Sequence, residues 1–208
     1  ALKLIRNDEM SNENSQYAKQ ISELVDKARA WRDSKEQRLQ NRINIEASFD
    51  LLVHALHDAD LQVRWDAAWL LNRLESERTI EPLLVYVRNP ENRNRGGSVR
   101  ILAKLGGARM RQPLLEMLHD PDANVRSAAM SGLARRGEAS AVEPFLQAFQ
   151  RVLNNEEEDA WMRYEVAMWI RLLSEKLNDK ASFASTIEGF EQLKNDGDPL
   201  VRKHALRA

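Results

Sequence analysis

Two histidines in the first half of the chain have a spacing that could bind a metal ion. His54 and His57 stand three residues apart, which on a helix places both imidazoles on one side. The sequence offers this pair no further ligand at a suitable spacing, and it contains no cysteine. His57 and His119 each precede an aspartate, and a basic side chain near a helix C-terminus stabilises the helix dipole. We therefore expect no metal site.

Catalytic motifs are scarce in this chain. Two glycine pairs, Gly96-Gly97 and Gly106-Gly107, lack the Lys-Ser/Thr that completes a phosphate-binding loop. The lack of cysteine removes a thiolate nucleophile, and no Ser-His-acid set has a recognisable context. The sequence therefore favours a binding protein over an enzyme, with no catalytic residue and no cofactor.

A Glu-Pro or Gln-Pro dipeptide recurs at a fixed interval along the chain. This interval predicts the helices on which any functional site must lie. Pro82, Pro113 and Pro144 are each 31 residues apart, and two apolar residues follow each of them. A constant period of this length is typical of proteins built from stacked helical repeats. We predict an N-terminal polar segment and capping helix over 1–47, followed by a repeat array over 48–208. The predicted units are 48–78, 79–109, 110–140, 141–180 and 181–208.

Each predicted unit consists of two helices joined by an acidic turn. Proline suits the first turn of the first helix, because its missing N–H would lack an intrahelical partner there. The turn reads Asp58-Ala-Asp60 in one unit and Asp120-Pro-Asp122 two units later, and the second acid is placed to cap the next helix. The second helix then shows apolar residues on one face. These are Val63, Ala67, Leu71 and Leu74 in the first unit and Val125, Ala129 and Leu133 in the third.

The pattern Asp-Pro-Asp-x-x-Val-Arg-x-x-Ala-x-x-x-Leu at 120–133 resembles the short bacterial HEAT-like repeats of phycobilisome-lyase-type proteins. The resemblance covers residues 48–208 and is weakest in the second unit, which departs from it at Asn94, Gly96 and Gly97. It implies an all-α fold, namely a right-handed α-solenoid (an α-α superhelix) of about four and a half helical hairpins. The second helices would line the concave side.

Members of this family have several activities, so the resemblance implies alternatives. They include scaffolds, immunity-type binders, bilin lyase subunits and DNA-base glycosylases. A glycosylase of this class would need an acid near aromatic side chains, and Asp66 lies between Trp65 and Trp69. A non-catalytic scaffold or adaptor that binds a partner protein accounts for more of the sequence. A bilin lyase subunit or a glycosylase is the alternative.

An arginine recurs near the start of each second helix. These arginines are Arg64, Arg95, Arg126, Arg163 and Arg202. Their recurrence beside turn acids predicts a structural ladder, in which each arginine reaches Asp58, Asp120 or Asp196 of its own or a neighbouring unit. A row of ligand-binding bases is the alternative. Exposed pairs of this kind contribute ~0.2–1 kcal/mol each, so they would fix geometry more than stability.

The residue after each ladder arginine and the residue four positions on point to another side of the second helix. If second helices line the concave side, this stripe faces the groove of the solenoid. Aromatic and arginine side chains are enriched where proteins bind one another. The predicted groove residues, with the bases that flank them, are Trp65, Trp69, Arg73, Arg100, Lys104, Arg135, Tyr164, Met168 and Arg171. The alternative places Trp65 and Trp69 in the packing between units or beneath the capping helix.

Residues 88–111 carry a basic cluster that could bind phosphate groups or an acidic partner. It contains Arg88, Arg93, Arg95, Arg100, Lys104, Arg109 and Arg111 against a single acid, Glu91. No aromatic side chain lies inside it to stack on a nucleobase. A solvated face, or a contact with the acidic residues 156–159, is the commoner explanation. The bases of the capping helix, from Arg29 to Arg42, are interleaved with acids and are expected to face solvent.

Composition narrows the class of protein. The 208 residues carry 31 Lys and Arg against 32 Asp and Glu, a net charge of −1, which argues against a dedicated nucleic-acid binder. No apolar run approaches the ~18 residues of a membrane span. The lack of cysteine fits a reducing compartment. We expect a cytoplasmic protein that binds another protein, or an acidic segment of one, through its concave face. Nucleic acid is the less favoured partner.

Overall fold

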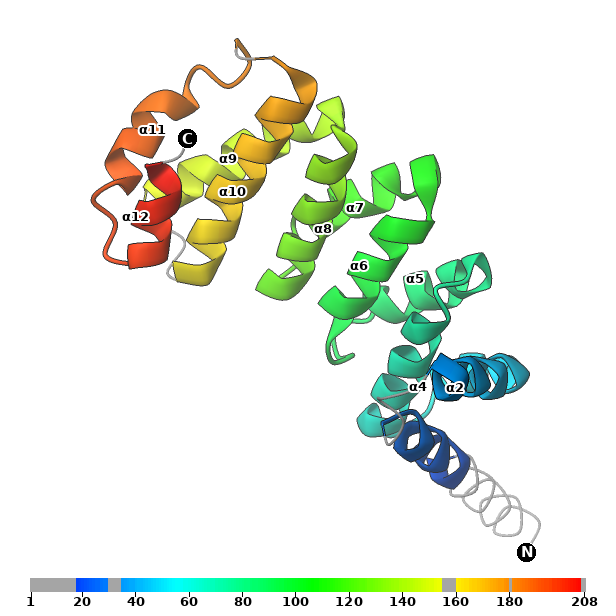
Figure 1. Cartoon of the computed structure of the whole chain (residues 1–208). Coiled ribbons are helices and arrows are strands. Elements are labelled where there is room, and N and C mark those ends of the chain that lie inside the picture. The colour runs from blue at the N-terminus through cyan, green and yellow to red at the C-terminus, as the bar shows by residue number, and fades with distance from the viewer. Residues whose placement is uncertain (1–17, 30–34, 155–159, 180, 207–208) are drawn as a thin grey trace, which may run out of the picture. The chain divides into compact units, whose positions relative to one another are not determined.

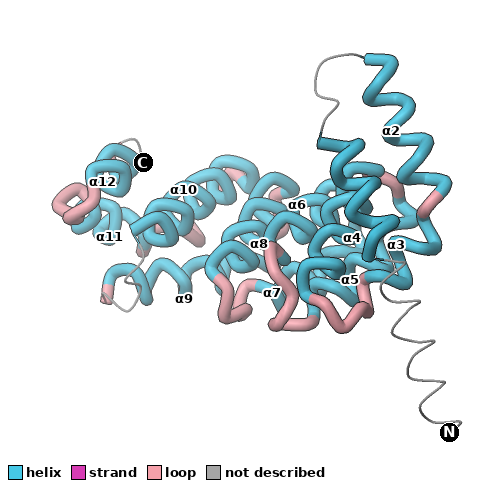
Figure 2. The backbone as a smooth tube through the Cα atoms, turned by 90° about the horizontal axis from the view of Figure 1, so that it is seen from below, coloured by secondary structure: helices cyan, strands magenta, loops and turns pink. Residues whose placement is uncertain are grey.

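The computed structural model describes residues 18–29, 35–154, 160–179 and 181–206 (Figure 1). These residues form helices joined by turns, with no strand among them (Figure 2). The chain divides into two compact units, of which unit 1 covers residues 1–105 and unit 2 covers residues 106–208. No helix in the described ranges is long and apolar enough to cross a membrane. The chain is thus all-α, as predicted.

Unit 1 consists of helical hairpins preceded by further helical segments. Residues 18–29 are helical, and α2 (Lys35–Ala47) follows. The hairpins join α3 (Phe49–Ala55) to α4 (Leu61–Leu74) and α5 (Ile80–Arg88) to α6 (Arg95–Leu105). α4 also packs against α2 and α6. The predicted continuity of the capping helix through residues 30–34 lies outside the described residues.

Unit 2 repeats the same helix order. Its hairpins join α7 (Arg111–Met117) to α8 (Ala123–Arg136), α9 (Val142–Leu153) to α10 (Ala160–Leu177), and α11 (Thr186–Leu193) to α12 (Pro199–Ala205). The second helix α10 packs against both α8 and α12, and α9 packs against α11 in a second layer (Figure 2). This packing of successive hairpins in two layers is that of a HEAT-like α-solenoid.

Aspartates build the turn between the two helices of a hairpin, as predicted. Asp60 caps α4 by accepting a hydrogen bond from the N–H of Gln62 at 2.7 Å. Asp122 caps α8 by accepting from the N–H of Asn124 at 2.8 Å. A cap of this kind satisfies a backbone donor that has no partner within the helix, and it stabilises the helix by about 1 kcal/mol.

The periodic prolines occupy the same place in three hairpins. A short 3₁₀ turn precedes α5, α7 and α9, over Glu77–Thr79, Gly107–Met110 and Ala139–Ala141. Pro82, Pro113 and Pro144 are then the third residues of these three helices. Proline costs the helix little stability at this position, because the N–H groups of the first turn of an α-helix have no intrahelical acceptor.

The predicted apolar face of the second helices forms the core. Every predicted core residue of α4 and α8 is buried, namely Val63, Ala67, Leu71, Leu74, Val125, Ala129 and Leu133. Each fully buried leucine or valine contributes about 1.5–3 kcal/mol relative to exposure. This burial fixes the rotation of each second helix, and it therefore determines which residues remain on the opposite face.

The second hairpin of unit 1 departs from the repeat, as its sequence indicates. α6 begins at Arg95 itself, whereas α4 begins three residues before Arg64. Asn94, immediately before α6, has a φ of 52°, in the left-handed region. A Cβ at Gly97 would lie 3.3 Å from the Asn94 side chain, so glycine gives this tight turn its room. The first turn of the second helix is lost as a result.

Candidate binding surface

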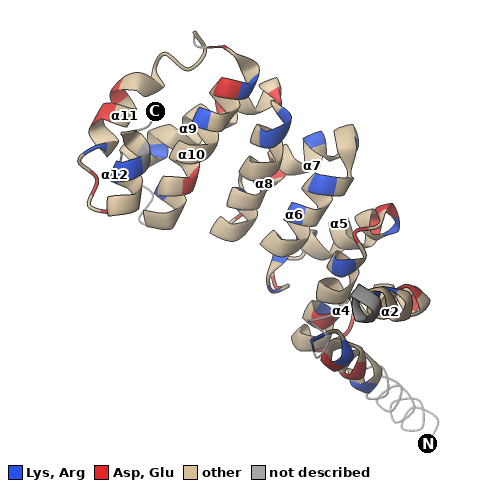
Figure 3. Cartoon of the chain, in the orientation of Figure 1, with Lys and Arg blue, Asp and Glu red and all other residues tan. Residues whose placement is uncertain are grey.

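The nine predicted groove residues fall into two sets, one in each unit. The unit 1 stripe consists of Trp65, Trp69 and Arg73 on α4 and Arg100 and Lys104 on α6. The unit 2 stripe consists of Arg135 on α8 and Tyr164, Met168 and Arg171 on α10. Each set lies on neighbouring second helices, because α4 packs against α6 and α8 packs against α10. Figure 3 marks the lysines and arginines along these helices in blue.

Two tryptophans form the apolar part of the unit 1 stripe. Trp65 and Trp69 are four residues apart on α4, and both are half-buried. The guanidinium carbon of Arg29 lies 5.9 Å from the ring centroid of Trp65 and 5.7 Å from that of Trp69. The guanidinium carbon of Arg73 lies 4.1 Å from the Trp69 centroid. Such cation–π contacts contribute about 0.5–1 kcal/mol each at exposed sites.

The helix over 18–29 thus contacts the unit 1 stripe through Arg29. This helix is anchored by Ile21 and Val25, both buried, and a nitrogen of Arg29 lies 3.9 Å from Oδ1 of Asp66 on α4. Arg29 was expected to face solvent, and its side chain is half exposed while it spans the two indole rings. Each ring therefore contacts the leading helix through Arg29 and is half-buried, and its place in a binding groove stays a prediction.

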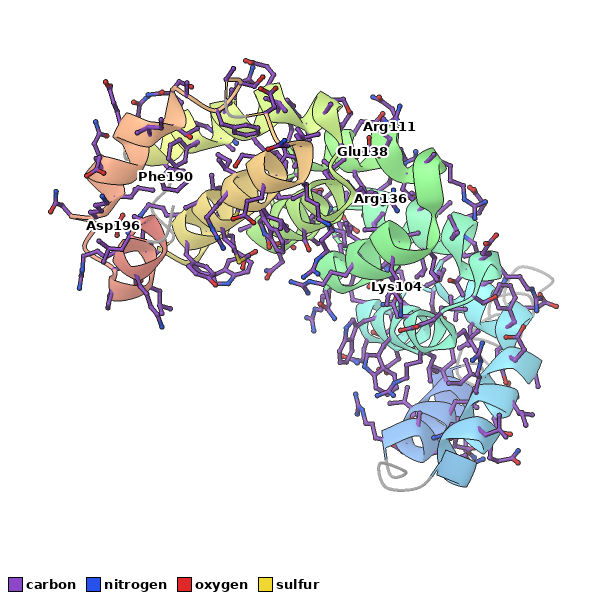
Figure 4. All side chains as sticks on the ribbon, turned by 45° about the horizontal axis from the view of Figure 1, so that its top comes forward. Lys104, Arg111, Arg136, Glu138, Phe190 and Asp196 are labelled. Carbon is purple, nitrogen blue, oxygen red and sulfur yellow. The ribbon has the colours of Figure 1, made fainter. Side chains whose placement is uncertain are left out.

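The cations on α6 complete the unit 1 stripe. Arg100 is exposed and forms no ion pair with any residue that the structure describes. Lys104 donates to a carboxylate oxygen of Glu75, just past the end of α4 (Figure 4). Both partners of this ion pair are about half exposed, so the pair contributes little to stability. Asn72 on α4 donates to Oγ of Ser98 on α6 at 3.1 Å and links the two helices beneath these side chains.

Every member of the unit 2 stripe contacts one of its own neighbours. The hydroxyl of Tyr164 donates to Sδ of Met168 at 3.6 Å. The guanidinium carbon of Arg135 lies 5.4 Å from the ring centroid of Trp169. Arg171 forms an ion pair with Glu175 at 2.8 Å, one helical turn on. In the unit 1 stripe, Arg100 is the one member that has no such contact among the described residues.

Glu165 organises the centre of the unit 2 stripe, and sequence reasoning did not single out this role. Its Oε2 accepts hydrogen bonds from Oγ of Ser127 at 2.6 Å and from Nε1 of Trp169 at 2.7 Å. Ser127 lies on α8, so the carboxylate links α8 to α10. The spacing of Glu165 and Trp169, four residues apart on one helix, was the signal that could have indicated this contact.

The recurrent arginines form a ladder through the turns, and their main acceptors are backbone carbonyls. Nη1 of Arg64 donates to the carbonyl of Asp58 at 2.7 Å, and Nη1 of Arg126 donates to that of Asp120 at 3.0 Å. Arg202 makes the same bond to Asp196 at 2.6 Å. Within a hairpin the arginine therefore reaches the backbone carbonyl of the turn acid instead of its carboxylate, whereas Arg163 reaches the carboxylate of Asp196 in the neighbouring hairpin, as predicted.

Two ladder arginines also reach the turn of the next hairpin, with different partners in the two units. In unit 1, Nε of Arg64 donates to the side-chain amide oxygen of Asn92 at 2.8 Å. In unit 2, Nε and Nη2 of Arg163 donate to the two oxygens of Asp196, each at 2.9 Å. The hydrogen bonds from Arg163 hold the pKa of Asp196 below its ordinary value, against burial, which would raise it. Unit 2 therefore contains a largely buried, bidentate ion pair.

The structure corrects the predicted basic patch at one residue, Arg95, which is buried. It is only 3% exposed, and its Nη1 donates to the carbonyl of Val87 at 3.2 Å. The shortened N-terminus of α6 turns this arginine into the protein, beside the buried Tyr86. The hydroxyl of Tyr86 donates to the carbonyl of Arg93 at 2.7 Å. Burial raises the pKa of Tyr86 to about 12, although the charges of Arg64 and Arg95 lower it.

The remaining bases of the 88–111 cluster are divided between the units. Arg88 and Arg93 are exposed in unit 1, whereas Arg109 and Arg111 belong to unit 2. Nε of Arg111 donates to Oε2 of Glu138 at 2.9 Å (Figure 4). The predicted contact with residues 156–159 lies outside the described residues. The bases of the cluster are thus divided between the two units, and one of them, Arg111, is paired with an acid.

The helical hairpins and their turn ladder define the class of protein as an α-solenoid. Residues 80–156 match the family model of HEAT repeats, from the start of α5 to beyond the end of α9. The chain is therefore a HEAT-like repeat protein. A comparison with curated proteins gave no match. In the described part of the chain, no group of three or more His, Cys, Asp or Glu side chains could hold a metal ion.

Proposed function

We propose that this protein is a non-catalytic scaffold that binds an acidic segment of another protein through the unit 1 stripe. HEAT repeats generally act as protein-interaction scaffolds. The observation that carries the proposal is the combination of two half-buried tryptophan rings on α4 with exposed cations on the adjacent α6. Tryptophan and arginine are the residues that most often dominate protein–protein binding energy.

The stripe offers separate contacts for apolar and acidic side chains. The exposed parts of Trp65 and Trp69 would bury apolar side chains of the segment. Arg100, which has no ion-pair partner among the described residues, would bind a carboxylate with the planar fork of its guanidinium. Lys104 would exchange Glu75 for a partner carboxylate at little cost, because exposed ion pairs contribute only ~0–1 kcal/mol.

The contacts of Arg29 favour this proposal over a glycosylase. The acid that a glycosylase of this class would need beside the tryptophans is Asp66, and a nitrogen of Arg29 lies 3.9 Å from its Oδ1. The burial of Arg95 likewise weakens the case for nucleic-acid binding through residues 88–111. No described contact specifically favours a bilin lyase subunit. The unit 2 stripe stays a prediction as a second contact surface.

An array of 15-residue peptides graded in acidic and apolar content tests the proposal. We expect the full chain to bind segments that combine Asp or Glu with large apolar residues. The double variant Trp65→Ala, Trp69→Ala should lose this binding, since it removes the apolar contact area. Arg100→Glu should lose it without a folding defect, because exposed substitutions rarely alter stability by more than ~0.5 kcal/mol.

The matched control is Trp161→Ala, which removes an exposed tryptophan from unit 2. We expect this variant to bind like the unmodified chain. Circular dichroism would establish that each variant is folded. Unchanged binding by both the folded double tryptophan variant and Arg100→Glu would refute the proposal.

A further inference from the structure

The last turn of α4 is followed by a glutamate in a backbone conformation that suits glycine. Glu75 has φ 46° and ψ 41°, in the left-handed region. A residue with a Cβ is strained there, because the Cβ approaches the following carbonyl oxygen. Among the described residues that are not glycine, only Glu75, Asn94 and Asn178 have a positive φ. Asparagine adopts this region far more readily than most residues, so Glu75 is the exception among the three.

The repeat shows which residue would be unstrained at this position. α8 has the same length as α4 and ends before Gly137, which stands two periods of 31 residues after Glu75. Gly137 has the same left-handed conformation, with φ 65° and ψ 44°. Glycine is common at the end of a helix because it has no Cβ. Glu75 therefore lowers stability relative to glycine, and backbone strain of this kind is concentrated where a side chain serves function.

The Glu75 side chain reaches a cation of the unit 1 stripe. Its Oε2 accepts a hydrogen bond from Nζ of Lys104 on α6. The side chain of Lys104 is 60% exposed and that of Glu75 is 48% exposed, so a bound partner can reach both. Gly137 provides no carboxylate at the equivalent position of unit 2. The acid is thus present in the unit to which we assign the partner site.

We propose that Glu75 is an internal competitor of the acidic segment for Lys104. This inference rests on the proposed function, and it identifies a residue that limits the affinity of that site. In the free protein the Glu75 carboxylate occupies the place on Lys104 that a carboxylate of the segment takes in the complex. Its negative charge also repels the segment. Glu75 therefore selects for segments with several acids, and it weakens the attraction of Lys104 for unrelated anions.

Exposed ion pairs set the size of this effect. Exchange of one exposed lysine–carboxylate pair for another changes the free energy little, so pairing with Lys104 adds little affinity in the unmodified protein. Without the competitor, Lys104 is unpaired before binding and gains a partner in the complex. The new pair should then strengthen binding about two- to fivefold.

Two variants of Glu75 separate the effect of its charge from that of its backbone. Glu75→Gln removes the charge and keeps a strained side chain, so it should bind about two- to fivefold more tightly with little change in Tm. Glu75→Gly also relieves the strain, so the same gain in affinity should come with a Tm about 2–4 °C higher. The probe is a labelled 15-residue peptide with two glutamates and two leucines, which is added to the full chain and followed by fluorescence anisotropy.

Two further variants make the test specific. Asn178→Gly removes the side chain from the left-handed residue after α10 in unit 2 and should leave the affinity unchanged. In a Lys104→Met background, Glu75→Gln should lose most of its effect, because the competitor no longer has a lysine to occupy.

Unchanged or weaker binding by Glu75→Gln would overturn the inference, and so would an undiminished effect in the Lys104→Met background. Either result leaves the proposed function standing if Arg100→Glu still abolishes binding. A peptide that binds neither the unmodified chain nor any variant would refute both.

Discussion

Asp66 in unit 1 and Glu165 in unit 2 follow the same repeat arginine, yet they have different partners. Glu165 reaches across to Ser127 and along its own helix to Trp169, so that the indole N–H of Trp169 is held by a carboxylate. Asp66 has a side chain one methylene shorter, and its nearest charged neighbour is Arg29 at 3.9 Å. Leu70 stands four residues after Asp66, so unit 1 has no indole N–H at the position that Trp169 occupies after Glu165.

The links between successive hairpins show the same contrast. Unit 1 joins Arg64 to the neutral amide of Asn92, whereas unit 2 joins Arg163 to the carboxylate of Asp196. Arg64 and Arg163 are similarly buried, but only Arg163 has a largely buried carboxylate as its partner, because Glu91, 4.0 Å from Arg64, is exposed.

The largest expected effect comes from breaking the buried ion pair of unit 2. Arg163→Met leaves the Asp196 carboxylate largely buried without its guanidinium, which should lower the free energy of unfolding by about 3 kcal/mol. Arg64→Met loses hydrogen bonds to neutral acceptors and a long contact with the exposed Glu91, and it should lower the free energy of unfolding by about 1–2 kcal/mol. Urea unfolding followed by circular dichroism measures both values. The exposed Arg88→Met is the control, and an equal loss in the two ladder variants would contradict the contrast.

Acidification should affect the same pair. The pKa of Asp196 in the folded protein lies below its ordinary value of 3.8, mainly because Arg163 donates hydrogen bonds to the carboxylate. A carboxyl group whose folded pKa is lowered stabilises the fold at pH values above the unfolded pKa. This stabilisation is then lost as the pH falls below about 3.8 towards the folded pKa. Arg163→Met should flatten this part of a stability–pH curve, whereas an unchanged curve would show that the pair has no such role.

Charge reversal should weaken peptide binding more in the unit 1 stripe than in the unit 2 stripe. Arg100→Glu in unit 1 should weaken binding of an acidic peptide by about tenfold or more, because it replaces an attraction by a repulsion. Arg135→Glu makes the same change in unit 2 and should alter the affinity by less than about threefold. Fluorescence anisotropy with one peptide measures both. A larger effect of Arg135→Glu would place the site in unit 2 instead.

The smallest effect concerns the two equivalent acids. Glu165→Gln weakens the hydrogen bonds from Ser127 and Trp169 and should lower the free energy of unfolding by about 1 kcal/mol. Asp66→Asn should change it by less than about 0.5 kcal/mol, since the Arg29 contact is long and partly exposed. Thermal unfolding of the two isosteric variants provides the comparison. A greater loss for Asp66→Asn would show that Asp66 contributes more to stability than Glu165, contrary to our prediction.

The core and the turns could be predicted from sequence because each depends on local spacing. Burial of Val63 and Leu71 follows from the helical period, and the cap at Asp60 follows from the position of an acid before a helix. The HEAT-like class follows from the same repeated pattern. These features need no knowledge of how distant residues pack.

The contacts around the proposed binding surface depend on tertiary packing and could not be predicted. Arg95 has the spacing of a ladder arginine, but the left-handed backbone of Asn94 shortens α6 and turns Arg95 inward. Arg29 belongs to a helix well before α4 in the sequence, so its position over Trp65 and Trp69 was not encoded in any local spacing. The sequence therefore predicted the stripe without indicating which of its residues contact their neighbours.

The most direct test of the central claim is a titration that follows the tryptophan indole N–H signals by NMR. The full chain, labelled with ¹⁵N, would receive an acidic peptide chosen from the array, and Trp→Phe variants would assign the signals. We predict that the signals of Trp65 and Trp69 shift on binding, whereas that of Trp169, held by Glu165, stays in place. Shifts of Trp169 without shifts of Trp65 and Trp69 would contradict the assignment of the binding surface to unit 1.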